Sequence, residues 1–253
     1  MKIFSAGSAL ADDALRKASQ NAYFASRLWE KNIKTHIAGA KCIFVGMEDK
    51  NKLYCLSMSW IIVGLGNPGE EYEGTRHNTG RMALDFFARQ MKFGEWKEDK
   101  KAKAHVVGGM IGKIAVVLVA PDTFMNKSGA AVAKFVKSQK AAERMVVVYD
   151  ELDLPLGALK LSFNRGSGGH KGIESIMQAV KTKKFTRVRI GISPETAGGK
   201  LKKPSGEKEV VDHILKAFRS AELETLKPVF KKTAQALEAI VTDGPERAMN
   251  RFN

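Results

Sequence analysis

The segment 60–80, with the sequence W-I-I-V-G-L-G-N-P-G-E-E-Y-E-G-T-R-H-N-T-G, constrains the fold of this chain more than any other. Residues 60–63 form a short, apolar, largely β-branched run that ends at glycines, which predicts a central strand of a sheet covered on both faces. The loop that follows carries His77 and two asparagines. Since ligands of open α/β sheets bind outside the carboxyl ends of strands, we expect a functional site here.

The glycines of this segment also match a different pattern. Gly64, Gly66 and Gly69 have the G-x-G-x-x-G spacing of dinucleotide-binding proteins. In those proteins the glycines lead directly into a helix whose N-terminus binds pyrophosphate. Here Pro68 interrupts the motif, and Asp85 comes too early to be the ribose-binding acid. A nucleotide-dependent oxidoreductase is therefore a weaker alternative that rests on the glycine spacing alone.

The composition indicates a basic protein that acts on an anionic partner. With 253 residues, 44% of them hydrophobic, the chain is long enough for one sizeable domain and an appendage. No apolar stretch reaches the ~20 residues that span a bilayer, so we expect a soluble protein with no membrane partner. The net charge of +15 favours nucleic acid as the partner, because lysine and arginine neutralise phosphates. The alternative is that the charge only keeps the protein in solution.

Cysteine usage and missing signatures narrow the chemistry further. The only cysteines are Cys42 and Cys55, which suggests neither a disulfide framework nor a cysteine-based metal site and fits a reducing compartment. The sequence has no C-x-x-C, H-E-x-x-H, G-x-S-x-G or P-loop signature. Most familiar hydrolase and nucleotide-binding motifs are therefore absent.

Residues 1–57 differ from the rest by weak periodicity and many small residues, and we expect an N-terminal extension before a domain at 58–253. The start of the extension resembles an amphipathic organelle transit peptide, although Asp12 and Asp13 are unusual in such peptides. Alternatively, translation begins at Met58. We expect a cytoplasmic protein, or a mitochondrial or plastid one if the extension is a transit peptide.

The rest of the chain alternates strands and helices. This pattern predicts an α/β fold, a single domain with a twisted, mixed and largely parallel sheet flanked by helices. Besides 60–63, strands are predicted at 114–119, 145–149, 159–163 and 188–192. Helices are predicted at 81–91, 128–138, 170–180, 212–218 and 221–242. The Gly-, Pro- and Lys-rich segment 193–208 is predicted to be a mobile surface loop, with the role of a lid or of an RNA clamp left open.

Polar residues follow several of these strands and can meet at one edge of the sheet. His77 is the natural general base, because the pKa of imidazole lies close to working pH. Asp150, at the end of the strand 145–149, can then orient it. Asn67 and Asn126 can donate amide N–H groups to a carbonyl or an oxyanion. The alternative for His77 is that it simply bonds a loop carbonyl, and for Asn67 and Asn126 it is a role in a turn or a helix cap.

The candidate chemistry is hydrolysis by water. No serine or cysteine stands out as a nucleophile, which leaves water activated by His77 as the simplest mechanism. A metal site formed by His77, Asp150 and His170 is disfavoured because these residues lack close ligand spacing in the sequence. We therefore expect no metal at these residues.

Basic residues near these segments suggest contacts with a phosphate backbone. Arg187 and Arg189 lie on one predicted strand and share a face, because strand side chains alternate. Together with Lys160 and Lys171 they can follow a phosphate backbone, beside a glycine-rich turn at 166–172 that suits an anion. The alternative is that they merely solvate the edge of a sheet.

Several motifs closely resemble the bacterial-type peptidyl-tRNA hydrolase family. They are I-V-G-L-G-N-P-G with Y-E-G-T-R-H-N-T-G, T-F-M-N-K-S-G, D-E-L-D-L-P, G-S-G-G-H-K-G and R-V-R-I-G-I. They follow the order of the family and cover nearly everything from Trp60 to the C-terminus. The resemblance implies cleavage of the ester between a peptide and the 3′ ribose of tRNA, by a monomer without metal or cofactor.

The resemblance also implies roles for particular residues. His77 matches the catalytic histidine of the family and Asp150 the aspartate that orients it. The positions that match the peptide-binding groove are Asn67, Tyr72, Met125 and Asn126. Lys171 departs from the pattern, because the family usually has an asparagine after G-G-H. A competing possibility is an RNA-binding protein that keeps the scaffold without turnover, although the intact histidine, aspartate and asparagines argue against it.

Overall fold

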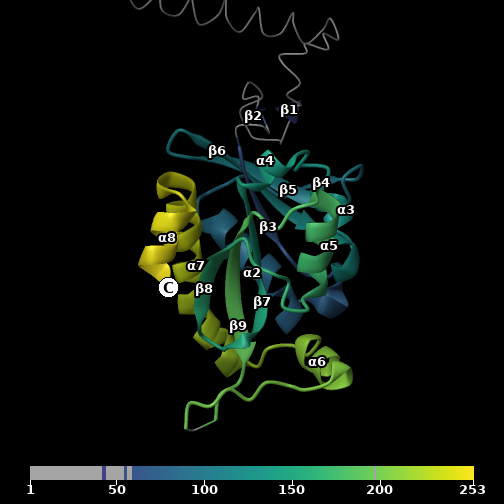
Figure 1. Cartoon of the computed structure of the whole chain (residues 1–253), viewed down its shortest axis with the longest axis vertical. Coiled ribbons are helices and arrows are strands. Elements are labelled where there is room, and N and C mark those ends of the chain that lie inside the picture. Colours follow the sequence, from purple (N-terminus) through teal and green to yellow (C-terminus); the bar gives the residue numbers. More distant parts are fainter. Residues whose placement is uncertain (1–41, 44–53, 56–58, 197) are drawn as a thin grey trace, which may run out of the picture.

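The fold was obtained as a computed structural model that describes residues 42–43, 54–55, 59–196 and 198–253 (Figure 1). Within these residues, helices lie on both faces of a seven-stranded sheet. A separate two-stranded antiparallel sheet pairs β1 (Cys42–Ile43) with β2 (Tyr54–Cys55). The expectations about a transit peptide and about a start at Met58 concern segments that lie largely outside the described residues.

The elements alternate along the chain much as the sequence predicts. The strands of the large sheet are β3 (Trp60–Gly64), β4 (Lys97–Asp99), β5 (Ala104–Ile111), β6 (Ile114–Pro121), β7 (Met145–Pro155), β8 (Leu159–Phe163) and β9 (Thr186–Ser193). The α-helices are α2 (Thr79–Gln90), α3 (Ser128–Val132), α4 (Gln139–Ala142), α5 (Lys171–Val180), α6 (Glu207–Ile214), α7 (Ser220–Asp243) and α8 (Pro245–Phe252). Short 3-10 turns are η1 (Glu70–Tyr72), η2 (Arg76–Asn78) and η3 (Met125–Lys127).

The sheet is mixed, with a parallel centre. Its strand order is β4-β5-β6-β3-β7-β9-β8, so β3 lies in the middle as predicted. Strand β3 is parallel to β6 and β7, and β7 is parallel to β9. The outer pairs β4–β5, β5–β6 and β8–β9 are antiparallel. The carboxyl ends of the four central strands therefore meet at one edge of the sheet, where the polar loops begin.

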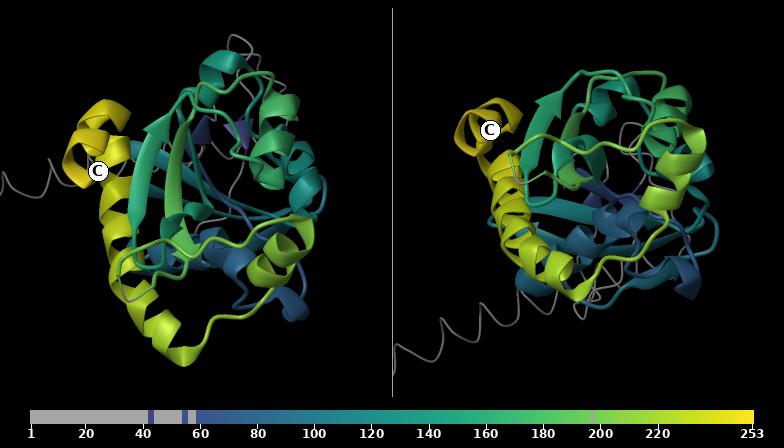
Figure 2. Two further views of the ribbon diagram at one scale, coloured as in Figure 1. Left: turned by 60° about the horizontal axis from the view of Figure 1, so that its bottom comes forward. Right: turned by 90° about the horizontal axis from the view of Figure 1, so that it is seen from below.

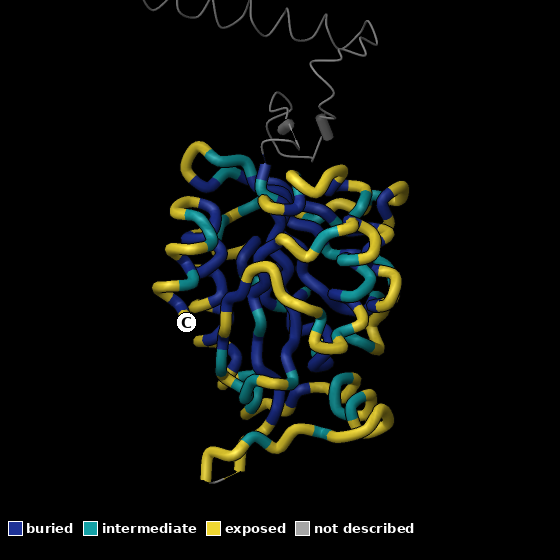
Figure 3. Tube along the Cα trace, in the orientation of Figure 1, coloured by how far each residue is buried: buried dark blue, intermediate teal, exposed yellow. Residues whose placement is uncertain are grey.

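Two hydrophobic cores fill the two faces of the sheet because strand side chains alternate. Ile62 points to one core, which also contains Phe87 of α2 and Leu237 of α7. Val63 points to the other core, with Val132 of α3 and Ile173 of α5. Figure 2 shows α7 and α8 on one side of the sheet and α5 on the other, and Figure 3 shows that the central strands are buried along most of their length.

Some predicted helix boundaries were wrong. The helix predicted at 128–138 ends at Val132, after which Phe135 and Val136 stay buried in turns rather than in a helix. The helix predicted at 212–218 is α6, which already begins at Glu207 and ends at Ile214. For 128–138, the helical spacing of the apolar residues indicated only that one side of the segment is buried. Tight turns can bury their residues in the same way.

The predicted strand 145–149 is longer in the structure. Strand β7 continues past Asp150 to Pro155, with a shift in its register against β9 between Glu151 and Pro155. Strands β4 and β5 and helix α8 had no counterpart in the prediction. The paired glycines and the histidine of β5 weaken its apolar pattern, so this strand depends on its antiparallel partner β6.

The segment that contains α6 is anchored to the turn that carries His77. Thr75 forms an isolated antiparallel bridge with Ala217, and the Phe218 N–H donates to the carbonyl of Gly74. The buried Arg76 guanidinium donates to the carbonyls of Lys216 and Ala217 and to Glu222 of α7. The turn that carries His77 is therefore tied to the segment after α6 and to α7.

Candidate active site

Close packing of helix α2 against the sheet places the loop after β3. A Cβ atom on Gly64 would lie 2.6 Å from the Gly80 carbonyl oxygen, and one on Gly80 would lie 2.3 Å from the Val148 carbonyl oxygen. Only glycine allows this approach. Gly64 thus serves helix packing, which explains one glycine of the G-x-G-x-x-G spacing without a nucleotide.

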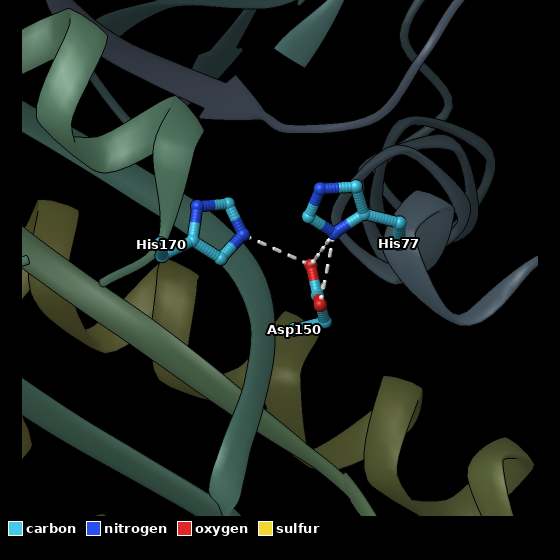
Figure 4. Close-up of side chains that lie close together, drawn as sticks. All are labelled: His77, Asp150 and His170. Carbon is cyan, nitrogen blue, oxygen red and sulfur yellow. Dashed lines mark hydrogen bonds and ion pairs between the residues drawn. The ribbon is translucent and has the colours of Figure 1, made fainter. Parts of the chain in front are cut away.

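His77 and Asp150 meet at the carboxyl edge of the central strands (Figure 4). The Nδ1 atom of His77, in turn η2, lies 3.0 Å from each carboxylate oxygen of Asp150 in β7. The two residues are 7% and 3% exposed. Because Nδ1 faces a carboxylate, it carries the proton, and the lone pair of Nε2 is left to act as a base.

The buried pair perturbs both pKa values. Burial by itself lowers the pKa of His77, but the charge of Asp150 and the hydrogen bond outweigh it and raise the pKa above its ordinary value of 6.5. Burial by itself would raise the pKa of Asp150, but the two neighbouring histidines hold it well below its usual range. Asp150 therefore stays ionised, and its charge favours the protonated form of His77.

His170 is a third member of this cluster, which the sequence suggested only as a metal ligand. Its Nε2 lies 3.1 Å from Oδ1 of Asp150, and its Nδ1 accepts hydrogen bonds from the N–H groups of Gly172 and Ile173 at the start of α5. Since Nδ1 is an acceptor, Nε2 carries the proton and donates it to the carboxylate. The N-cap residue of α5 thus also orients the carboxylate of Asp150.

The fold brings together three groups that are far apart in the chain. The ligand atoms of His77, Asp150 and His170 all lie within 4.8 Å of one another. A metal ion here would require His170 to give up its Nε2 proton, and the Nδ1–H tautomer would face two backbone N–H donors. It would also move the His77 proton to Nε2 and remove the base. The hydrogen bonds therefore suit a proton network better than a metal site.

Asn67 is anchored through its side chain and its backbone. Its Oδ1 accepts a hydrogen bond of 2.8 Å from the N–H of Met125 in η3. Its own N–H donates to Oδ1 of Asn78 at 2.8 Å, and its carbonyl accepts from Nδ2 of Asn78 at 3.0 Å. Asn67 and Asn78 are both buried. Of the residues predicted to bind substrate, Asn67 and Met125 are thus brought into direct contact.

The other two predicted substrate-binding residues are more accessible. Asn126 follows Met125 in η3 and is exposed, and Tyr72 is half-buried. The ring of Tyr72 meets that of Phe124 edge to face, with ring centroids 6.3 Å apart. Phe124 is 55% exposed, more than any other large apolar side chain in the described part of the chain. Tyr72, Phe124 and Asn126 thus form an accessible polar and aromatic surface. Phe124 was not among the residues predicted from the sequence.

The structure corrects the prediction for Arg187. Its side chain is fully buried, its guanidinium carbon lies 4.5 Å from the ring centroid of Phe185, and its Nη2 contacts the sulfur of Met177 in α5. Helix α5 covers this position, so the side chain is not available to a phosphate of an RNA ligand. The alternation of the strand correctly predicted the shared face but not how far the helix covers it.

The other three basic residues remain accessible to different degrees. Lys160 of β8 is exposed and lies opposite Arg189 of β9 on the same face of the sheet. Arg189 is half-buried, and its Nε donates to Glu151 at 2.8 Å. The Lys171 side chain is 70% exposed, and its ammonium lies 3.9 Å from Glu174. These three side chains are therefore accessible to a ligand, and the predicted phosphate contacts remain a prediction for them.

Comparison with known proteins gives one consistent result. The sequence model described as peptidyl-tRNA hydrolase matches residues 61–253. The chain is 40% identical over 195 residues to a peptidyl-tRNA hydrolase of Aquifex aeolicus, over 76% of this chain and 95% of that protein. It is 41% identical over 195 residues to one of Carboxydothermus hydrogenoformans, over 77% and 98%. The crystal structure of peptidyl-tRNA hydrolase from Acinetobacter baumannii is similar with a TM-score of 0.69 and 32% identity, over 78% of this chain and 95% of that one.

Proposed function

Because the chain belongs to the peptidyl-tRNA hydrolase family, we propose that it hydrolyses the ester between a peptide and the 3′ ribose of tRNA, with His77 as general base. The observation that carries this assignment is the buried contact between His77 and Asp150, 3.0 Å apart, at the carboxyl edge of the central strands. The reaction recycles tRNA from aborted translation.

His77 activates water in this mechanism. Its Nε2 accepts a proton from water as the water oxygen attacks the carbonyl carbon of the ester. Asp150 stabilises the imidazolium that forms and holds the ring through Nδ1. The imidazolium then returns the proton to the ribose oxygen as the ester bond breaks. The products are a tRNA with a free 3′ hydroxyl and a peptide carboxylic acid, which releases its proton to the solvent.

Asn67 and Asn126 position the substrate. Since Oδ1 of Asn67 is occupied by the Met125 N–H, its Nδ2 is the group left to donate to the substrate carbonyl and to the oxyanion formed from it. The exposed amide of Asn126, in the adjacent turn, holds the attacking water or the peptide. Tyr72 and Met125 line the groove for the peptide. An ester suits this site, because an alkoxide leaves more readily than an amine and no covalent intermediate is needed.

The tRNA contacts the basic surface beside the site. Lys160, Lys171 and Arg189 meet phosphates of the tRNA, which fits the net charge of +15. No helix in the described part of the chain is long and apolar enough to cross a membrane. We further propose that the protein acts as a monomer in the cytoplasm, which sizing by light scattering and cell fractionation would test.

The central experiment is hydrolysis of N-acetyl-aminoacyl-tRNA by the purified protein and by His77→Ala. We expect the wild type to cleave this N-blocked substrate in preference to free aminoacyl-tRNA, and the variant to lose most of its turnover while keeping tRNA affinity. A wild type that binds tRNA without cleaving it would show that the protein is an RNA-binding member of the family.

A further inference from the structure

Asn78 binds both backbone groups of a single residue of the site. Its Oδ1 accepts from the N–H of Asn67 at 2.8 Å, and its Nδ2 donates to the Asn67 carbonyl at 3.0 Å. Asn78 is 4% exposed, and Asn67 is 7% exposed. The side-chain amide of Asn78 thus pairs with the Asn67 backbone as a neighbouring strand would. If the amide were rotated by 180°, its Nδ2 donor would face the Asn67 N–H donor, so this orientation of the amide is fixed.

This arrangement leaves one polar group of Asn67 free for a ligand. The backbone of Asn67 is held by Asn78, with a longer contact of 3.4 Å from Nη1 of Arg81 to its carbonyl, and its Oδ1 is held by Met125. No acceptor for its Nδ2 is found within the described part of the chain. The orientation of the Asn67 amide therefore depends on contacts from η2, η3 and the first turn of α2, of which the two from Asn78 and the one from Met125 are the shortest.

Gly66 leaves room for the contact between Asn78 and Asn67. A Cβ atom on Gly66 would lie 2.9 Å from Oδ1 of Asn78, so a larger residue at position 66 would displace the amide. Asn78 is also the neighbour of His77 within turn η2. The same turn therefore presents the proposed base and anchors the proposed carbonyl donor.

We propose that Asn78 is a positioning residue of the hydrolase, which holds Asn67 so that its Nδ2 meets the reacting carbonyl at a fixed distance from His77. The inference rests on the role proposed above for Asn67. Asn78 itself touches neither the substrate nor the water. Its contribution to turnover acts entirely through the orientation of Asn67, because small misplacements of a catalytic group reduce rates strongly.

A double-mutant cycle tests this dependence. The variants are Asn67→Ala, Asn78→Ala and the double variant, with kcat and KM measured on N-acetyl-aminoacyl-tRNA. We expect Asn78→Ala alone to lower kcat about 10- to 100-fold. In the Asn67→Ala background, which has no side-chain amide to orient, the same change should lower kcat by less than about twofold.

Asn253 provides a matched control. Its Oδ1 accepts from the N–H of Leu161 at 2.7 Å and its Nδ2 donates to the Leu161 carbonyl at 3.1 Å, the same pair of bonds at an outer strand. Asn253→Ala should lower the melting temperature as a structural change does, but leave kcat unchanged. If Asn78→Ala does not fold, the cycle uses Asn78→Asp, which keeps the acceptor for the Asn67 N–H and loses the donor.

Each outcome has a definite meaning. An equal loss of kcat from Asn78→Ala in both backgrounds would overturn the inference, because the residue would then act through His77 or through folding. Full activity of Asn67→Ala would refute the role of Asn67 and with it the inference, while an inactive His77→Ala would still support hydrolysis by the proposed base. Loss of activity in Asn253→Ala matching that in Asn78→Ala would show a general effect of stability.

Discussion

His77 and His170 approach the same carboxylate oxygen from two directions, with His77 Nδ1 at 3.0 Å and His170 Nε2 at 3.1 Å from Oδ1 of Asp150. Their ring centroids are 5.0 Å apart. One histidine comes from the turn before α2 and the other from the N-cap of α5. The basicity of His77 therefore depends on how Asp150 is shared between the two.

Replacing the shared carboxylate should slow the reaction and change its pH dependence. We expect Asp150→Asn to lower kcat about 10³- to 10⁴-fold, because the amide no longer favours the Nδ1–H tautomer or the imidazolium. Loss of the negative charge should also lower the pKa of His77, which Asp150 raises. Since the base must be neutral, the acid limb of the kcat/KM profile should move to lower pH. An unchanged limb would show that another group titrates.

Removing the second histidine should move the acid limb the other way. In His170→Ala, Asp150 loses a hydrogen bond and interacts more strongly with protonated His77, so the pKa of His77 should rise. The acid limb should shift to higher pH, with kcat reduced by no more than about tenfold. Loss of the helix cap should also destabilise the fold by about 1 kcal/mol. A shift to lower pH would contradict this account of the shared carboxylate.

The lysine that departs from the family pattern should be dispensable for chemistry. The Lys171 side chain is 70% exposed and approaches only Glu174 at 3.9 Å among the ion pairs of the described residues. We expect Lys171→Asn to keep activity within about tenfold, or ~1.4 kcal/mol in the barrier. Steady-state kinetics of this variant on N-acetyl-aminoacyl-tRNA provide the measurement. Complete loss of turnover would mean that the lysine has an essential role.

The buried arginine and the exposed lysine should behave differently towards tRNA. Arg187→Met should leave tRNA affinity unchanged and should not destabilise the fold, because Nε and Nη1 of Arg187 are buried without hydrogen-bond partners. Lys160→Ala should weaken binding and reduce the slope of log K against log salt by about 1. Filter binding over a salt series, with thermal melts, measures both. If Arg187→Met folds normally but binds tRNA more weakly, Arg187 does contact a phosphate, as the sequence predicted.

Chelation should not affect turnover if the His–Asp–His cluster is a proton network. The two backbone N–H groups that face Nδ1 of His170 fix its Nε2 proton towards Asp150, where a metal ion would need a lone pair. We therefore expect kcat to be unchanged after dialysis against EDTA. Added zinc should inhibit, because zinc bound at the cluster would move the His77 proton to Nε2 and remove the lone pair that acts as the base. Activity that returns only with added metal would overturn this assignment.

Much of the fold could be predicted because strongly apolar, β-branched runs have few alternatives. The predictions at 60–63, 114–119 and 159–163 coincide with β3, β6 and β8, and the mixed α/β sheet is confirmed. Strand β5 escaped prediction because Gly108 and Gly109 interrupt its pattern, and it is stabilised by pairing with β6. Helix α8 was not predicted: it has eight residues, follows α7 after a single glycine, and buries only Ala248 and Phe252.

The site divides in the same way. The sequence by itself determined the chemical groups: a histidine, an aspartate and asparagines placed after strands whose carboxyl ends meet at one edge. Only the tertiary structure decided how those groups pair: that His170 shares Asp150, that Asn78 holds the backbone of Asn67, and that α5 buries Arg187 while Lys160 stays exposed. The physical reason is that sequence periodicity predicts the face on which a side chain lies. The groups that bond to that side chain or bury it belong to elements distant in the chain.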